Sequence, residues 1–227
     1  MMGTIVNSIA VVAGALLGVF LRKGIKEQYT STIMDGMALA VVIIGIMGAF
    51  EMNNLIVVLA SIVVGGIIGE KLDLDKRLEN LGTNMEKRFG KGDSDFSKGF
   101  IMASLVYCIG AMSILGALES GLTGNHETLY AKSVLDGVSA VIFASTFGIG
   151  VAFSAVAVFL YQGAITLLAS SVKDFLTPEV INEMSSIGGI LIMAIGINIL
   201  GIKKIKIANM LPAIFIPIVY YSIVALF

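Results

Sequence analysis

Two polar side chains, Asp136 and Gln162, interrupt an otherwise apolar stretch and are the first candidates for chemistry. No charged residue follows Asp136 until Lys173. A carboxylate near lipid is costly and usually faces a partner or a cavity, and a buried amide must also find hydrogen-bond partners. These residues therefore predict a site for a small solute or a cation. Two structural alternatives stay open: Asp136 could pair with Lys132 one helical turn earlier, and Gln162 could simply bridge helices.

Three further polar residues extend the candidate site. Ser145 and Thr146 lie in the segment STFGIG (145–150), where their hydroxyls can bond freed backbone carbonyls or a ligand. Asn198 lies near a helix end, where capping or a bond between helices is the alternative to ligand binding. The same alternatives apply to Asn7 and Asn209.

Nothing in the sequence predicts an enzyme. His126 is the only histidine and Cys108 the only cysteine, so neither a metal site nor an internal disulfide is expected. Motifs for a nucleophile with its base, or for a phosphate-binding loop, are absent from the sequence. We therefore expect no catalytic residues, no metal and no cofactor. The net charge of −1 gives no electrostatic basis for binding nucleic acid.

The composition identifies lipid as the solvent of this chain. Of 227 residues, 57% are hydrophobic and 14% are charged, and the mean hydropathy is +0.95. A soluble domain carries about 25% charged residues, so this chain has too few to cover a water-facing surface. We predict an all-α fold, a polytopic transmembrane helix bundle that forms one integral-membrane domain over 1–227, with the lipid bilayer as its partner.

Apolar segments of about 20 residues, the length that spans a bilayer, predict about eight spans. The predicted helices are 4–21, 33–50, 54–70, 99–118, 131–147, 150–171, 179–201 and 207–226. The stretch 134–172 is too long for one span, and the glycines and hydroxyls of STFGIG favour a turn there. A re-entrant pair over 131–171 remains the alternative. Pro212 and Pro217 predict a kink in the last helix.

Basic residues predict the orientation. Every Lys and Arg except Lys132 and Lys173 falls in the segments 22–32, 71–98 and 202–206, which lie on one side of an eight-span arrangement. Because cytoplasmic loops carry the excess of Lys and Arg, both termini are predicted outside.

The cytoplasmic loop 71–98 is predicted to form a short amphipathic helix. Its apolar residues recur at four- and three-residue spacing with charges between them: Leu74, Leu78, Leu81, Met85 and Phe89. Such a helix can lie on the inner membrane surface or against the bundle. A helix that docks a cytoplasmic partner through 72–89 is the alternative.

Glycine patterns add two structural hypotheses. The segment 35–50 resembles 186–201, with Gly45 matched to Gly196, and the two would run in opposite directions as in the inverted repeats of transporters. Small residues at helical spacing also provide faces for close packing, inside the bundle or in a homodimer. These small residues are Gly14, Gly18, Gly65, Gly66 and Gly69.

Several segments together resemble the bacterial family of membrane proteins called domain of unknown function 554. They are GTIVNSIAVVAGALLG (3–18), GGIIGEKLDLDKRLENLG (65–82), GAMSILGALESGLTGNHETLYAKSVLDGVSAVIFASTFGIG (110–150), YQG (161–163) and GINILGIKKIKIANMLPA (196–213). The resemblance covers essentially the whole chain. It implies a multi-pass protein of the bacterial inner (cytoplasmic) membrane, and it carries over no activity and no ligand residue.

The favoured function is transport of an unknown small solute or ion, with Asp136 and Gln162 near its path. An ion channel and a scaffold or regulator that holds a cytoplasmic partner through 72–89 are the alternatives. The substrate, the coupling ion and the oligomeric state are not encoded in any pattern described above.

Overall fold

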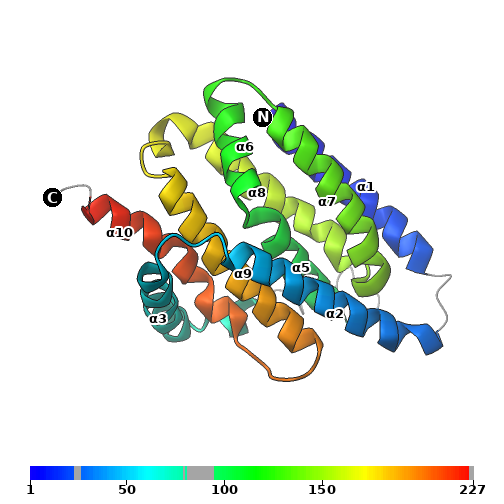
Figure 1. Cartoon of the computed structure of the whole chain (residues 1–227). Helices are drawn as coiled ribbons and strands as arrows, with labels where there is room; N and C mark the ends of the chain where they lie inside the picture. The colour runs from blue at the N-terminus through cyan, green and yellow to red at the C-terminus, as the bar shows by residue number, and fades with distance from the viewer. Residues whose placement is uncertain (23–26, 79, 81–94, 225–227) are drawn as a thin grey trace. The chain divides into compact units, whose positions relative to one another are not determined.

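The computed structural model describes residues 1–22, 27–78, 80 and 95–224, and this part of the chain contains helices and no strands (Figure 1). The helices are α1 (Met2–Arg22), α2 (Glu27–Ala49), α3 (Leu55–Leu72), α5 (Phe96–Cys108), α6 (Ala111–Leu122), α7 (Glu127–Phe147), α8 (Gly150–Val172), α9 (Pro178–Ile199), the 3-10 helix η1 (Ile207–Phe215) and α10 (Ile216–Val224). The predicted all-α fold is therefore confirmed.

Six helices of the described chain are long and apolar enough to cross a membrane. They are Met2–Arg22, Ser31–Ala49, Leu55–Leu72, Gly150–Val172, Pro178–Ile199 and Ile207–Val224. The α5–α6 pair makes a seventh if it counts as one span. The one predicted span that remains, 131–147, corresponds to α7. This helix carries Glu127, Lys132 and Asp136 and is not among the helices that are apolar enough to cross. Eight spans are thus not confirmed.

Two predicted helices are broken in the structure. The segment 99–118 was expected as one helix, but α5 ends at Cys108, α6 begins at Ala111 and the two axes differ by 59°. The break includes Gly110, a residue that weakens a helix interior. The segment 207–226 starts as the 3-10 helix η1, which contains Pro212, and becomes α-helical at Ile216. A proline removes a backbone donor, which explains the irregular start.

Two other helix ends have clear local causes. Thr177 caps α9 by accepting a hydrogen bond from the Val180 nitrogen, and Pro178 occupies the first turn. The turn expected at 145–150 is confirmed, because α7 ends at Phe147, α8 begins at Gly150 and Gly148 adopts a φ of 76°. This left-handed conformation favours glycine.

The predicted amphipathic helix falls largely outside the described residues. The structure describes a short helical segment over 74–78, whereas most of 72–89 is not described. The partner-docking hypothesis for 72–89 therefore stays a prediction.

The chain divides into two compact units. Unit 1 contains α1, α5, α6, α7, α8 and the start of α2, and unit 2 contains α2 from Ala38 onward, α3, α9, η1 and α10. The expectation of one integral-membrane domain is not tested by this division.

In unit 1, α1 and α7 run side by side in the same direction (Figure 1). A side chain at Gly14 would collide with the backbone oxygen of Gly137, and one at Gly18 with the backbone oxygen of Val141. Small residues thus let the two helix backbones approach closely, as is common between membrane helices. The close approach fixes the register between α1 and α7.

In unit 2, α2 and α9 pack closely in opposite directions. A Cβ at Gly45 would meet the backbones of Met193 and Gly189, and a Cβ at Gly196 would meet those of Val42 and Ala38. The glycines of α3 are used in the same way, because Gly65 lies against Ala213 and Gly69 against Asn209, both in η1. The homodimer through glycine-rich faces stays a prediction, but most of these glycines already serve contacts within the chain.

A polar cluster joins the end of α3 to η1. Glu70 Oε1 accepts a hydrogen bond from Lys206 Nζ at 2.6 Å, and Glu70 Oε2 accepts one from Asn209 Nδ2 at 2.6 Å. The Glu70 carboxylate raises the pKa of Lys206, chiefly through this hydrogen bond. Asn209 Oδ1 in turn accepts from the backbone nitrogen of Asp75 at 2.7 Å, so Asn209 makes the bonds between elements that its position suggested.

Candidate functional site

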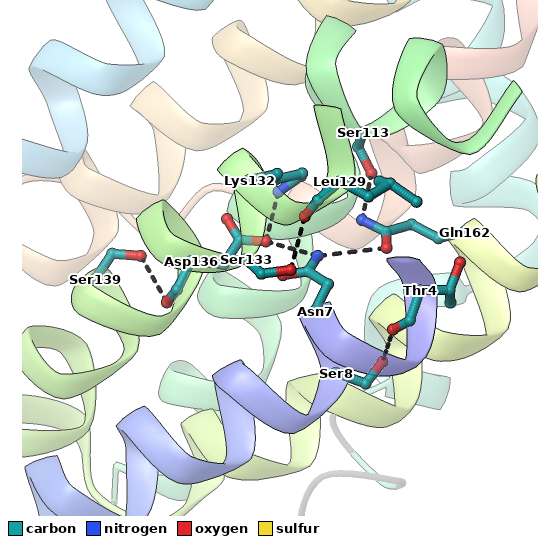
Figure 2. A network of polar contacts seen from close by, with 10 residues as sticks. All are labelled: Thr4, Asn7, Ser8, Ser113, Leu129, Lys132, Ser133, Asp136, Ser139 and Gln162. Carbon is teal, nitrogen blue, oxygen red and sulfur yellow. Dashed lines mark hydrogen bonds and ion pairs between the residues drawn. The ribbon is translucent and has the colours of Figure 1, made fainter. Parts of the chain in front are cut away.

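A buried polar network lies within unit 1 (Figure 2). Its five members come from four helices: Asn7 of α1, Ser113 of α6, Lys132 and Asp136 of α7, and Gln162 of α8. We call these five residues the Asn7 network. All five side chains are buried, in a chain that is otherwise dominated by apolar residues.

An ion pair forms the charged part of the network. Lys132 Nζ lies 2.5 Å from Asp136 Oδ2, and the side chains are 7% and 9% exposed. The two residues are four positions apart on α7, so one helical turn brings them together. The Lys132 ammonium also lies 5.9 Å from the centre of the Tyr107 ring, a distance at which an aromatic ring attracts a cation. The pairing with Lys132 that was open from the sequence is therefore present.

Asn7 connects this ion pair to Gln162. Its Nδ2 donates to Asp136 Oδ2 at 3.0 Å and to Gln162 Oε1 at 3.3 Å. Because both partners are acceptors, they determine which end of the Asn7 amide carries the nitrogen. Gln162 Nε2 then donates to Ser113 Oγ at 3.0 Å. A continuous chain of hydrogen bonds thus runs from Lys132 to Ser113 through four helices.

Helix packing explains how these residues meet. On α1, Asn7 lies on the same buried face as Gly14 and Gly18, which contact α7, so the α1–α7 register places Asn7 beside Asp136. One turn after Gln162, Thr166 Oγ1 donates to the Ala117 carbonyl of α6 at 3.1 Å. This contact holds α8 against α6, where Ser113 lies.

Some polar atoms around the network have no hydrogen-bond partner among the described residues. They are Thr4 Oγ1, Asn7 Oδ1 and Tyr107 Oη, and all three residues are fully buried. An unpaired buried polar atom costs about 1–3 kcal/mol. Such atoms are therefore available to a bound polar ligand, which would recover part of this cost.

The structure brings together only some of the predicted site residues. Asp136 and Gln162 share the network through Asn7. The hydroxyls of Ser145 and Thr146 both donate to the Ile142 carbonyl, at 2.7 and 3.3 Å, near the opposite end of α7. Neither hydroxyl takes part in the Asn7 network.

Asn198 lies in unit 2 and closes the turn after α9. Its Nδ2 donates to the Ile205 carbonyl at 2.9 Å, and its Oδ1 accepts from the Ile205 nitrogen at 2.7 Å. Both ends of the amide are therefore occupied by backbone, as expected for a residue near a helix end. A ligand would have to break these bonds.

Sequence reasoning missed three parts of the site. Asn7 was expected only to cap or bridge helices, and neither Thr4 nor Ser113 was singled out. The signal for Asn7 and Thr4 was their position on the face of α1 that carries Gly14 and Gly18.

Within the described residues, no group of three or more His, Cys, Asp or Glu could hold a metal ion.

These features define a class of protein: a helical membrane protein with several apolar spanning segments and a buried, charged polar network. Residues 2–222 match the model of a family described as "Protein of unknown function (DUF554)", and the chain belongs to that family. The resemblance inferred from the sequence is therefore confirmed.

Two relatives cover nearly the same length. The chain is 36% identical to the uncharacterized membrane protein YdfK of Bacillus subtilis (strain 168) over 231 residues, which span 100% of this chain and 98% of that protein. It is 30% identical to the uncharacterized protein YqgA of Escherichia coli (strain K12) over 219 residues, covering 93% of this chain and 92% of that protein. No solved structure matches the chain significantly.

Proposed function

We propose that this protein transports a small polar solute or ion across the bacterial inner membrane and binds it at the Asn7 network. The observation that carries the proposal is the buried Lys132–Asp136 pair, joined by Asn7 to Gln162 inside a membrane protein. Ionisable groups within membrane helices are expensive to bury and typically mark the path of a solute or ion. Purely structural contacts between membrane helices can be made with uncharged side chains.

The ion pair offers a way to exchange a ligand. A cation would compete with Lys132 for Asp136, and an anionic group would compete with Asp136 for Lys132. The unpartnered Asn7 Oδ1 and Thr4 Oγ1 add an acceptor and a hydroxyl for a polar ligand.

The α2–α9 packing supports an inverted relationship between 35–50 and 186–201. Matching Gly45 to Gly196 also matches Val42 to Met193 and Ala38 to Gly189. Under this match, the contact of Gly45 with Met193 and Gly189 corresponds to the contact of Gly196 with Val42 and Ala38. Contacts that exchange in this way are expected between segments related by a two-fold axis, and inverted repeats are frequent in transporters.

We also infer eight membrane crossings, with α7 as one of them and both termini outside. The 21-residue length of α7 and its parallel packing on α1 support this inference. The eight-crossing arrangement also places the basic loops on one side, as does a re-entrant pair whose two arms return to the outer face.

A thermal-shift screen of the purified protein in detergent tests the function. The panel contains inorganic ions, amino acids, organic acids and nucleobases. A ligand present at 100 times its dissociation constant should stabilise the folded protein by about 2.7 kcal/mol. We expect the ligand-induced shift to be lost in Asp136→Asn, Asn7→Ala and Gln162→Ala.

Ser8→Ala is the matched control, because the Ser8 hydroxyl bonds only the Thr4 carbonyl of its own helix. It should keep the ligand-induced shift. A ligand that stabilises all four variants equally would place the binding site elsewhere. Uptake of the identified ligand into proteoliposomes should saturate with concentration; ionic conductance without saturable uptake would instead indicate a channel.

A further inference from the structure

A second buried carboxyl, Glu183 of α9, lies in unit 2 and takes no part in the Asn7 network. Its side chain is fully buried, with 0% exposure. Glu183 was not singled out from the sequence, because it follows the polar start of a predicted helix. Its surroundings differ from those of Asp136 in the charge of the neighbouring side chains.

Glu183 has no cationic partner among the described residues, whereas Asp136 is paired with Lys132. Among the Lys, Arg, His, Asp and Glu residues of the described chain, those that are buried are Lys132, Asp136 and Glu183, so no buried positive charge remains for Glu183. A carboxylate buried without a counter-charge carries a large desolvation cost, and such a group usually becomes neutral instead.

The two oxygens of the Glu183 carboxyl have different environments. Oε1 accepts hydrogen bonds from the backbone nitrogens of Asn53 at 3.2 Å and Asn54 at 2.6 Å, in the turn between α2 and α3. Oε2 is buried and makes no hydrogen bond with the described residues. This asymmetry matches a neutral carboxylic acid, in which the carbonyl oxygen accepts two bonds and the other oxygen carries the proton.

No described group around Glu183 carries a compensating positive charge. Tyr221 of α10 interacts with the carboxyl, and Glu179 lies one turn earlier on α9. Glu51 is in the same α2–α3 turn and is exposed. Two uncharged groups favour a carboxylate: the Tyr221 hydroxyl of α10, and the amino end of α3, where Asn54 caps the helix. A helix end supplies only about half an elementary charge.

We propose that Glu183 is a proton-binding site of this membrane protein. Its carboxyl carries a proton on Oε2 while Oε1 accepts the backbone hydrogen bonds of the α2–α3 turn. This site is independent of the solute proposed for the Asn7 network.

The dependence of stability on pH distinguishes the two protonation states. Glu183→Gln keeps an oxygen that can accept the bonds from Asn53 and Asn54 but cannot titrate. If folded Glu183 holds a proton, wild type loses stability relative to this variant as the pH rises above about 4.3, where unfolded glutamates ionise. If folded Glu183 is ionised, wild type gains stability relative to the variant only below about pH 4.3, and the difference is constant above that pH.

The experiment is therefore a series of melting temperatures of the detergent-purified wild type and Glu183→Gln from acid to alkaline pH. The proposal expects the wild-type melting temperature to fall relative to that of the variant as pH increases. A rise, or a constant difference, overturns it. Glu179→Gln is the matched control, because Glu179 is an exposed glutamate on the same helix and should not reproduce this trend.

Infrared spectroscopy provides a second measurement that does not require Glu183→Gln to fold. Wild type at neutral pH should show the absorption of a protonated carboxylic acid, and this absorption should persist in Asp136→Asn, which removes the other buried carboxyl. Absence of the absorption from wild type, or its loss in Asp136→Asn, overturns the assignment to Glu183.

Discussion

The ammonium nitrogen of Lys132 lies 2.5 Å from Asp136 Oδ2, one helical turn away, and both side chains are buried. The pair therefore behaves as one neutral unit that is assembled within α7. It needs no other helix to form, but Asn7 of α1 also donates to the same carboxylate oxygen. The hydrogen bond from Asn7 therefore links this pair within α7 to the packing of α1 on α7.

Removing both partners of this pair should cost less than the two single removals added together. Lys132→Ala or Asp136→Ala leaves one buried charge without its partner, which we expect to destabilise the folded protein by about 3–5 kcal/mol. The double variant leaves no unpaired charge and should lose less than the sum of the single losses. Thermal unfolding of the four purified proteins measures this coupling. Additive losses would mean that the two charges do not stabilise each other.

Parts of the site that depend on local sequence could be predicted, and parts that depend on packing could not. The Lys132–Asp136 pair follows from a four-residue spacing, and the turn at Gly148 follows from the length of the apolar stretch and its glycines. The bond from Asn7 to Asp136 joins residues 129 positions apart. Only the register between α1 and α7 determines that contact.

The fold was predicted where composition alone decides it. Apolar segments located the helices, but glycine did not locate every break: Gly110 lies at the α5–α6 bend, whereas Gly163 lies inside the unbroken α8. Whether a glycine breaks a helix depends on what packs against it, which a single sequence does not contain. Glu183 was missed because its neighbours along the chain resemble a solvated helix start.

Close packing of α1 on α7 predicts opposite effects for two glycine substitutions. Gly14→Ala would place a methyl group against the backbone oxygen of Gly137, and overpacking of this kind costs about 1–3 kcal/mol. Gly36→Ala is the matched control, because a Cβ there meets no heavy atom within 4 Å and alanine favours a helix. Melting temperatures should fall for Gly14→Ala and stay equal or rise for Gly36→Ala. Equal effects would contradict the close α1–α7 contact.

We expect Asn198 to stabilise the folded protein rather than to bind the ligand. Asn198→Ala removes two hydrogen bonds to the Ile205 backbone, each worth about 0.5–1.5 kcal/mol, and should lower the melting temperature. Once a ligand is known, its dissociation constant should be unchanged in this variant, which isothermal titration can measure. A large loss of affinity would restore Asn198 as a site residue.

Single cysteines can test whether α7 and α8 both cross the membrane. Cys108 is the only native cysteine and is buried, so it should react little with a membrane-impermeant maleimide. Lys173→Cys, between α8 and α9, should be labelled from outside intact cells, and Lys203→Cys, after α9, only once the membrane is opened; both positions are exposed. The labelling patterns of these two variants serve as references for the outer and inner sides of the membrane. A third cysteine, in the α7–α8 turn, is then compared with them.

The third position is Ile149, which lies in that turn and is partly exposed. If α7 and α8 each span the bilayer, Ile149→Cys should be labelled in the same way as Lys203→Cys, only after the membrane is opened. In a re-entrant pair the turn would end within the bilayer, and Ile149→Cys would remain unlabelled in opened membranes or react from outside. Because the Lys132–Asp136 pair lies at the other end of α7, labelling of Ile149→Cys from inside would place that pair toward the outer face. A solute would then reach the Asn7 network from outside first.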